Sequence, residues 1–545
     1  MTRIRTASRE NAFVKQAGVL VTAGLLARLI GFVYRIPLTN LIGDPGNAIY
    51  AAGYYIYAFL LVLSSAGLPV AISKMVAERI ALKQYRNAHR VFQTAMVTSC
   101  SLGTFFAMIL VIFGKEIAAL SGKPESYHAI LTLVPTLVLV AAMSVFRGYF
   151  QGMNTMVPTA VSQIVEQVLN AIFSVYLAYA FLQIGVAQGE KNIALGAAGG
   201  TAGTGVGALA GLIVVVFCYS LIHSKIQKRV RHAKQAAEER KLDLLRELLF
   251  TAWPIILGTA IFSLTNIIDV ATILHILQGS LAYTEEQASI LYGQFTGKYL
   301  PLSNLPAAIS TALSMAVIPS IAMSMKLKDR RAVSQKTHLT FRLSMIVSAP
   351  AAVGLGFMAG PIYRMLFFEE PGGAEIMMVG AAAIVFIAVF NTATGILQGT
   401  GHVKLPVIAA LVGAVVKVVL NIALLPIPQL NIYGAAISTT VCYLVAAALN
   451  LYLIKRFVGI TIRLKDILLK PLMASILMGI FSLGAYYVFT MIFPSATFAT
   501  LFAIMFAMIF YVLFMLLIGG FKEEDIRSLP KGDRMANLLI THHLI

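Results

Sequence analysis

Runs of about twenty apolar residues recur along the chain, and segment 501–520, LFAIMFAMIFYVLFMLLIGG, contains no charged residue at all. A helix needs about 20 apolar residues to cross the hydrocarbon core of a bilayer. The composition agrees, because 59% of the residues are hydrophobic and 12% are charged, whereas soluble domains have about 25% charged residues. These features exclude a soluble globular protein, a disordered chain and a nucleic-acid-binding protein.

A closed β-barrel can also satisfy backbone hydrogen bonds in lipid, but its strands are about ten residues long and alternate in hydropathy. The continuous apolar runs do not fit this pattern. The sequence therefore predicts an all-α polytopic membrane protein with about 14 transmembrane helices, at approximately 17–43, 48–73, 91–113, 127–150, 157–186, 195–222, 248–277, 290–325, 341–363, 374–399, 404–426, 430–454, 467–493 and 497–520.

The basic residues predict the orientation of these helices. When the loops are assigned in turn to the two sides of the membrane, 34 of the 42 Lys and Arg residues fall on one side, 4 on the other and 4 within the spans. Cytoplasmic loops are enriched in Lys and Arg, so we expect a multi-pass protein of the bacterial cell membrane with both termini cytoplasmic. The net charge of +19 then reflects topology and anionic lipid headgroups rather than nucleic acid.

The two halves of the chain repeat. Three pairs of segments match in the same order: 148–170 with 395–421, 65–73 with 314–322, and the Gly-Ala-Ala at Gly196 with the one at Gly434. Each half has six spans, so both halves enter the membrane from the same side, as in transporters built from parallel repeats. The predicted organisation is two pseudo-symmetric six-helix lobes and two C-terminal helices: an N-lobe at 1–222, a charged cytoplasmic linker at 223–247, a C-lobe at 248–456, helices 13 and 14 at 457–520, and a cytoplasmic tail at 521–545.

The sixth span contains glycines at every fourth position, at 199, 203, 207 and 211. Small residues at this spacing let helices pack closely in lipid. No Gly-Lys-Ser/Thr follows, so this segment is not a phosphate-binding loop of an ATPase.

Charged residues within the spans are the candidates for function. Insertion scales assign a cost of roughly 2.5–3.5 kcal/mol to such a residue, which usually faces a cavity or another charge. Their sum is +2, which favours an anionic ligand over a cationic one. These residues are Arg28, Arg35, Glu166, Asp269, Lys298 and Lys417.

Arg28 and Arg35 lie seven residues apart in the first span, with Gly31 between them on the same helical face. Arginine binds phosphate oxygens in bidentate fashion, so this face suits a phosphate or diphosphate. In the alternative interpretation, Arg35 reaches the membrane surface and Arg28 pairs with Glu166.

Tyr50, Tyr54 and Tyr57 form a stripe on the second span. Aromatic faces stack on sugar rings, which makes Tyr54 a candidate for substrate binding. Tyrosines are also common at membrane interfaces, and this second interpretation stays open.

Further polar groups are candidates for coupling transport to an ion gradient. Glu166 lies on the fifth span, Asp269 on the seventh, and Lys417 and Asn421 share a face of the eleventh. We expect that Asp269 and Lys417 can pair, and that protonation of a carboxylate or release of a cation couples transport to a gradient. A static ion pair is the alternative.

The eighth span is rich in proline, and broken helices in transporters mark gates or binding sites. Gln294 and Lys298 lie one turn apart near its start, where Lys298 could meet an anionic headgroup. Bending points are expected at its glycine and prolines and at similar segments of spans two, four and ten: Gly297, Pro301, Pro306, Pro319, 65–69, 151–158 and 398–406.

Several segments resemble the lipid II flippase-like branch (MurJ, YtgP and SpoVB type) of the multidrug/oligosaccharidyl-lipid/polysaccharide (MOP) exporter superfamily. The similarity runs from about residue 11 to 520. It is clearest in ARLIGFVYRIPLTNLIGD (27–44), GLPVAISKMVAE (67–78), FRGYFQGMN (146–154), VSQIVEQV (161–168) and TNIIDV (265–270).

This resemblance implies a flippase that moves an undecaprenyl-diphosphate-linked peptidoglycan precursor to the outer leaflet by alternating access, for growth or for sporulation. A first-helix arginine of the family matches Arg28, its second falls one residue from Arg35, and a basic residue of the eighth helix falls near Lys298. Some relatives bind Na⁺ beside a carboxylate that matches Asp269, but Lys417 lies near that place here.

Two other functions stay open, namely a multidrug or cation antiporter of the same superfamily and an exporter of another lipid-linked polysaccharide. An antiporter for cations would favour acidic cavity residues, against the net +2. An enzyme is not expected, because the one acidic loop cluster, EEPGGAE at 369–375, is typical of solvated surface. We expect no metal site and no cofactor, coupling to Na⁺, H⁺ or membrane potential, membrane lipids as partners, and a functional monomer.

Overall fold

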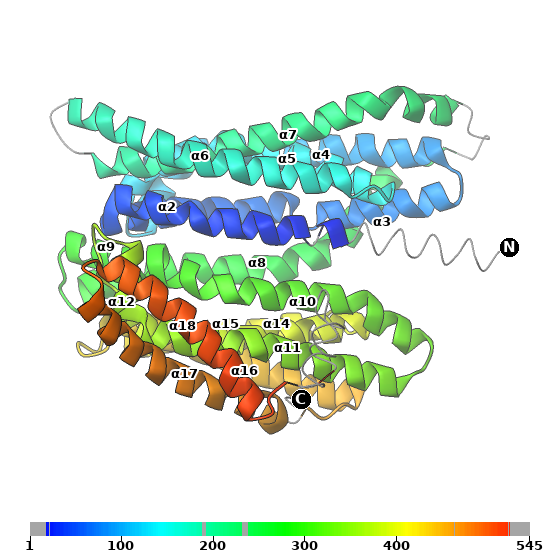
Figure 1. Ribbon diagram of the computed structural model, residues 1–545. Helices are drawn as coiled ribbons and strands as arrows, with labels where there is room; N and C mark the ends of the chain where they lie inside the picture. The colour runs from blue at the N-terminus through cyan, green and yellow to red at the C-terminus, as the bar shows by residue number, and fades with distance from the viewer. Residues whose placement is uncertain are drawn as a thin grey trace. The chain divides into compact units, whose positions relative to one another are not determined.

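The computed structural model describes residues 18–20, 22–187, 192–231, 238–462, 464–521 and 523. Every regular element over these residues is a helix (Figure 1). A helix satisfies its own backbone hydrogen bonds, which lipid cannot satisfy. The predicted all-α polytopic fold is confirmed.

The number of spans differs from fourteen for two local reasons. Among the described residues, twelve helices are long and apolar enough to cross a membrane, or thirteen if the pair Ala374–Gly380 and Ala383–Gly399, bent by 50°, counts as one. At the N-terminal end, the apolar helix Gly18–Val33 is followed by a helix that continues past Gly43, whose backbone is not helical (φ 69°, ψ −178°). Gly43 is where the first span is predicted to end, and a positive φ favours glycine.

The described chain forms two compact units. The first consists of Met1–His275 with Glu285–Gly293, and the second of Ile276–Thr284 with Gln294–Ile545. The predicted lobe boundaries follow the sequence repeat rather than these contacts, and they stay a prediction.

The first unit contains ten helical segments with defined bounds. They are Gly18–Val33, α2 (Arg35–Ser65), α3 (Leu68–Ala81), α4 (Tyr85–Leu120), the short 3-10 helix η1 (Pro124–Ser126), α5 (Tyr127–Gly152), α6 (Val157–Ala187), α7 (Ile193–Arg231), α8 (Lys241–Gly279, through His275) and α9 (Glu285–Gly293). Helix α9 is attached here by the Lys123 ammonium, which lies 2.9 Å from the Glu285 carboxylate.

The second unit includes the last two helices, α17 and α18, which pack on each other (Figure 1), while α17 also packs on α11. The described elements of this unit are the π-helix η2 (Gln294–Tyr299), α10 (Leu300–Lys326), α11 (Arg330–Phe357), α12 (Ala359–Leu366), α13 (Ala374–Gly380), α14 (Ala383–Gly399), α15 (Leu405–Leu424), α16 (Asn431–Leu453), the π-helix η3 (Ile454–Val458), α17 (Leu464–Ile492) and α18 (Ala496–Leu517).

The glycine stripe of α7 is a packing surface, as predicted. A Cβ atom at Gly199 or Gly203 would overlap the backbone of α6, and one at Gly207 would lie 2.6 Å from the Glu166 carbonyl oxygen. Helices α6 and α7 run side by side along most of their length (Figure 1). Because glycine has no Cβ atom, the two backbones can approach, and this close contact holds helices together in lipid.

The sequence repeat corresponds to equivalent packing in the two units. In the first unit, a Cβ atom at Gly148 of α5 would lie 2.9 Å from Pro69 Cα of α3. In the second, a Cβ atom at Gly395 of α14 would lie 2.8 Å from Ser314 Cβ of α10. Matching segments that lie far apart in sequence therefore contact each other in the same way inside each unit.

Contrary to expectation, the prolines of the eighth predicted span do not break α10. Helix α10 continues through Pro306 and Pro319, and Pro301 lies in its first turn, where a missing N–H costs no helical hydrogen bond. The distortion lies instead in η2, the preceding π-helix. Segments 151–158 and 398–406 are not bends within spans but contain the turns between α5 and α6 and between α14 and α15.

The predicted linker 223–247 is held to the first unit by ion pairs. Its residues 223–231 belong to α7 and 241–247 to α8. The buried guanidinium of Arg79 on α3 lies 2.5 Å from the Glu239 carboxylate and 2.7 Å from that of Glu247. Three carboxylates of the linker are bound in total, since Arg86 and Arg90 of α4 both pair with Glu238.

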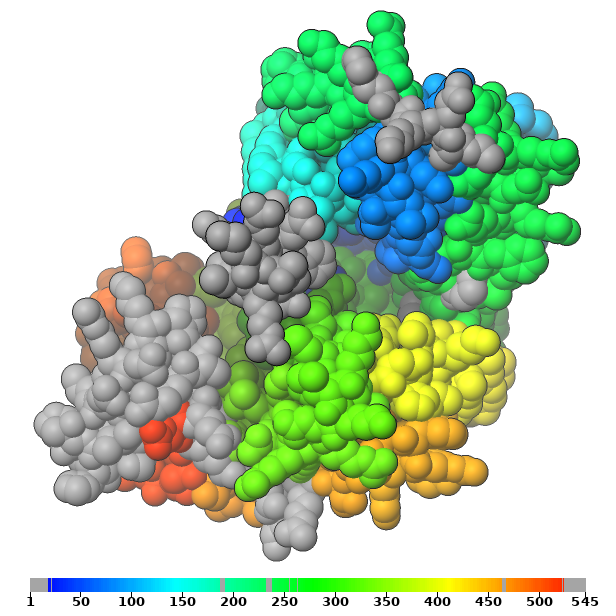
Figure 2. Space-filling view, turned by 90° about the vertical axis from the view of Figure 1, so that its right-hand side faces the viewer, coloured from blue at the N-terminus to red at the C-terminus, as the bar shows by residue number. Residues whose placement is uncertain are grey.

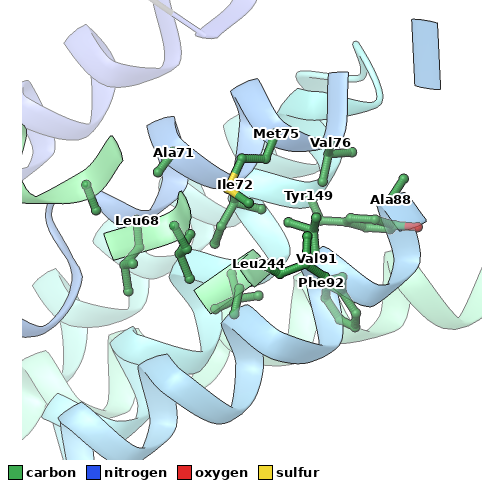
Figure 3. Packing of buried hydrophobic residues seen from close by; sticks show 14 of the residues in the cluster. Leu68, Ala71, Ile72, Met75, Val76, Ala88, Val91, Phe92, Tyr149 and Leu244 are labelled. Atoms are coloured by element: carbon green, nitrogen blue, oxygen red, sulfur yellow. The ribbon is translucent and has the colours of Figure 1, made fainter. Parts of the chain in front are cut away.

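An apolar core lies beneath these ion pairs. Figure 3 shows Leu68, Ile72 and Met75 of α3 directed toward Val91 and Leu244, which belong to α4 and α8. Tyr149 of α5 joins the same cluster and packs on Phe92 with ring centroids 4.7 Å apart. This core fixes the ends of α3, α4, α5, α7 and α8 relative to one another.

Candidate functional site

A cluster of one arginine and three tyrosines lies on α2 in the first unit. The Arg35 guanidinium carbon lies 4.2 Å from the centroid of the Tyr50 ring, and the rings of Tyr50 and Tyr54 stack at 5.8 Å. Tyr57 contacts Tyr54 at 5.9 Å. Tyr50 and Tyr57 are buried, whereas Arg35 and Tyr54 are half-buried. Two rings of the predicted stripe thus belong to the core, and Tyr54 keeps accessible surface.

Stacking favours Arg35 as an anion-binding group. A guanidinium that lies over a ring uses its face for the cation–π contact, and its N–H groups point outward in its own plane. Those groups match phosphate oxygens in bidentate fashion. The ring also restricts the side chain, so less conformational entropy is lost when an anion binds.

Arg28 is exposed on the helix Gly18–Val33. Tyr34, which joins this helix to α2, keeps helical backbone angles (φ −72°, ψ −20°). That Arg28 and Arg35 share one helical face stays a prediction from their seven-residue spacing. Between them, a Cβ atom at Gly31 would lie 3.5 Å from the Gln167 side-chain oxygen, so this position faces α6.

Glu166 pairs with an arginine of α5 that is not among the charged candidates named from the sequence. The Arg147 guanidinium lies 2.7 Å from the Glu166 carboxylate, and its Nε donates to the Ser162 hydroxyl at 2.9 Å. The alternative in which Arg28 pairs with Glu166 is therefore wrong, because the partner of Glu166 is Arg147. Arg147 and Glu166 both lie in the family-like segments FRGYFQGMN and VSQIVEQV, which is the signal that could have joined them.

The other candidate coupling residues are buried in different units. Asp269 lies on α8 in the first unit, while Lys417 and Asn421 lie on α15 in the second. Their pairing stays a prediction. Over the part of the chain that the structure describes, no group of three or more His, Cys, Asp and Glu side chains is arranged to hold a metal ion.

Lys298 and Gln294 contact a loop of the second unit. The fully buried Lys298 ammonium donates to the Glu370 carbonyl at 2.5 Å and to the Gly372 carbonyl at 3.2 Å. Gln294 packs against the same loop, since a Cβ atom at Gly373 would lie 2.8 Å from Gln294 Cβ. Both side chains hold the loop in the state seen here. Glu369 and Glu370 of this loop, and Glu375 in the first turn of α13, are exposed.

Comparison with known sequences supports the family resemblance. Residues 13–325 match the family Polysacc_synt, described as "Polysaccharide biosynthesis protein", and residues 296–423 match MatE. Three relatives come from Bacillus subtilis (strain 168). "Uncharacterized membrane protein YabM" is 27% identical over 96% of both chains, "Lipid II flippase MurJ" 28% identical over 81% of this chain and 82% of its own, and "Stage V sporulation protein B" 25% identical over 84% and 86%.

Solved structures show the same fold. An inward-facing MATE family transporter of the MOP superfamily aligns with a TM-score of 0.66 and 13% identity, covering 81% of this chain and 98% of its own. Lipid II flippase MurJ in an inward closed conformation aligns with a TM-score of 0.65 and 15% identity, covering 91% and 97%. The fold is thus that of these transporters. Since the first family match spans more than half of the sequence, this multi-pass membrane protein belongs to the polysaccharide biosynthesis protein family.

Proposed function

We propose that this protein is a flippase for a lipid-linked oligosaccharide, and specifically that it moves an undecaprenyl-diphosphate-linked peptidoglycan precursor such as lipid II from the inner to the outer leaflet by alternating access. It acts as a monomer in the cell membrane with both termini cytoplasmic. The observation that carries the proposal is the Arg35 guanidinium stacked on Tyr50 beside the accessible Tyr54. A curated relative, a lipid II flippase, supports the substrate class.

The residues have separate roles in this proposal. Arg28 and Arg35 bind the diphosphate, and Tyr54 packs against the first sugar. Lys298 and Gln294 reach the headgroup only after they release the loop at 370–373. Glu166, Asp269, Lys417 and Asn421 couple the movement to an Na⁺ or H⁺ gradient or to the membrane potential. No cofactor is required.

The first test is rescue of cells depleted of their own lipid II flippase. Arg35→Ala should abolish rescue, and Arg35→Lys should restore little, because an ammonium cannot make the bidentate contact. Lys328→Ala, at an exposed position outside the candidate cluster, serves as the control. Protein abundance in the membrane is measured for each variant, and full rescue by Arg35→Ala at normal abundance would contradict the proposed role.

Transport itself is measured with purified protein in vesicles that contain a labelled lipid-linked precursor. Imposed Na⁺, H⁺ and voltage gradients are compared one at a time. The gradient that accelerates headgroup movement identifies the driving force, and no protein-dependent movement under any gradient contradicts the flippase.

A multidrug antiporter is the second candidate, because residues 296–423 match MatE and MATE transporters share the fold. Drug resistance in an efflux-deficient host distinguishes the two functions. Resistance that survives Arg35→Ala, together with failed rescue by the unmodified protein, would favour the antiporter.

A further inference from the structure

A cavity of about 230 Å³ opens at one end of the first unit, where the ends of α3, α4, α5 and α7 meet. Figure 2 shows this end of the unit, with the α3–α4 region in blue beside segments of α7 and α8 in green. The charge distribution of the sequence predicts that this end is cytoplasmic. The cavity is lined by Ile80, Tyr85, Ala88, Tyr149, Met153, Thr155, Ile222, Lys225, Ile226, Arg229 and Val230.

The inner wall of the cavity is the apolar core of Figure 3. Ala88, Tyr149 and Ile226 are buried members of that core, and Ile80 and Met153 pack against it. This wall cannot hydrate an ion. It suits hydrocarbon, such as the first acyl carbons of a lipid.

One polar group is built into this wall. Tyr149 is 3% exposed and lines the cavity. Its ring packs on Phe92, and its hydroxyl makes no hydrogen bond to any residue that the structure describes. A tyrosine hydroxyl that is this deeply placed normally has a partner. An ester or phosphate oxygen in the cavity would supply one.

The mouth of the cavity carries two cations on successive turns of α7. Lys225 and Arg229 are exposed, and the Arg229 guanidinium carbon lies 6.0 Å from the Tyr85 ring centroid. Neither forms an ion pair within the described residues. The adjoining sequence at 232–237, HAKQAA, contains no acidic residue.

Three carboxylates near this end already have partners. Glu238, Glu239 and Glu247 pair with Arg79, Arg86 and Arg90, as described above. Lys225 and Arg229 form no ion pair with these three carboxylates, whereas Arg79, Arg86 and Arg90 do. An anion is the group that fits between them.

The size and position of the cavity select the class of anion. It lies past the apolar run of α7, where the predicted topology puts the lipid headgroups, and basic pockets between helix ends bind anionic headgroups. Its volume is below the roughly 300–1,000 Å³ of sites that enclose a whole small molecule. It fits a headgroup and the carbons next to it, while the remaining acyl chains stay in the bilayer.

We infer that this cavity binds an anionic glycerophospholipid of the surrounding leaflet, with the phosphate between Lys225 and Arg229, the glycerol region against Tyr149, and the chains leaving toward the bilayer. The site belongs to the first unit alone and does not depend on the transported substrate. A bound lipid would join the ends of α3, α4, α5 and α7, which makes the stability of this unit sensitive to the anionic lipid content of the membrane.

The test measures lipid adducts of the purified full-length protein by native mass spectrometry, with phosphatidylglycerol and phosphatidylcholine of the same acyl chains. The protein should prefer phosphatidylglycerol. A cation near a membrane surface contributes about 1 kcal/mol to anionic-lipid binding, so one lost charge should lower the affinity about fivefold. K225Q/R229Q should lower it roughly 25-fold. Tyr149→Phe should lower it less and leave the fold intact.

The control K228Q/R231Q removes two charges from the same helix end, outside the cavity. An equal loss in this control, or no loss in K225Q/R229Q, would overturn the site. Ala88→Leu fills the cavity without changing charge and should weaken lipid binding while the apparent melting temperature stays within a few degrees. Displacement of the lipid by equimolar inorganic pyrophosphate, or a preference for undecaprenyl diphosphate over phosphatidylglycerol, would overturn the assignment to a structural phospholipid.

Discussion

At the scale of single residues, Lys298 and Arg35 differ in how their positive charge is used. The Lys298 ammonium is fully buried and donates to the Glu370 and Gly372 carbonyls. The Arg35 guanidinium is half-buried and stacks on Tyr50. Arg35 can therefore bind an anion directly, whereas Lys298 must first lose two carbonyl acceptors. A role for Lys298 in transport then requires movement of the loop that it holds.

Replacing Lys298 should loosen this loop. Lys298→Met keeps the apolar stem but removes the two hydrogen bonds to the carbonyls of residues 370 and 372, and a hydrogen bond from a charged group contributes about 1.5–3 kcal/mol. Hydrogen exchange of the amides at 368–373 should become faster, with little change in α17 and α18. Lys328→Met, at an exposed position, is the control, and unchanged exchange in Lys298→Met would show that the loop is held by other contacts.

The sequence predicts which residues bear charge inside the spans, but not which of them pair. Arg28, Arg35 and Glu166 are recognisable because a charge in an apolar run is costly. The partner of Glu166 is Arg147, on a different helix. Spacing along one helix defines a face, but the register between two helices depends on packing and is not written in either segment alone.

At the scale of elements, the close spacing between α6 and α7 depends on the glycines of α7, which have no Cβ atom. A Cβ atom at Gly203 would overlap the backbone of Ser174, which cannot rotate away as a side chain could. Gly484 on α17 has no neighbouring atom within 4 Å of its Cβ position. The two glycines therefore offer a matched pair of substitutions.

Gly203→Ala should destabilise the protein, and Gly484→Ala should not. The first change forces two backbones apart at a cost of about 1–3 kcal/mol. The second removes a helix-interior glycine and should be neutral or stabilising by roughly 0.5–1 kcal/mol. Melting temperatures in detergent check both, and equal values for the two variants would contradict the packing role of the stripe.

A helix boundary can be predicted from the sequence where it depends on the backbone conformation of a single residue. Gly43 ends the predicted first span and has a positive φ in the structure. Pro306 and Pro319 show the limit of that approach, because α10 accommodates them without ending. Whether neighbouring helices satisfy the hydrogen bonds that a proline frees is a property of packing, and the sequence of one helix does not state it.

At the scale of the whole molecule, the distribution of lysine and arginine predicts the topology. Both termini and the connection between α7 and α8 should face the cytoplasm. Fluorescent protein fused to either terminus should therefore fold and fluoresce, and alkaline phosphatase fused there should stay inactive. The same reporters fused after Lys123 should show the reverse, and activity of phosphatase at the C-terminus would refute an even number of spans.

The sequence predicts the repeat of the two halves, but it does not predict where the two compact units of the structure divide the chain. Matching glycines at 148 and 395 reveal the two halves, since they pack on matching helices. The units nevertheless place α8 through His275 with the first half of the chain. The ion pairs of Arg79 with Glu239 and Glu247 hold the start of α8 there, and no pattern within either segment predicts them.

These ion pairs make covalent continuity between α7 and α8 dispensable. A gene split in the sequence 232–237 would yield two polypeptides, and Arg79, Arg86 and Arg90 on the first would capture Glu238, Glu239 and Glu247 on the second. Co-expressed halves should therefore purify as one complex, and charge reversal at Arg79 should abolish their co-purification far more than it harms the intact chain.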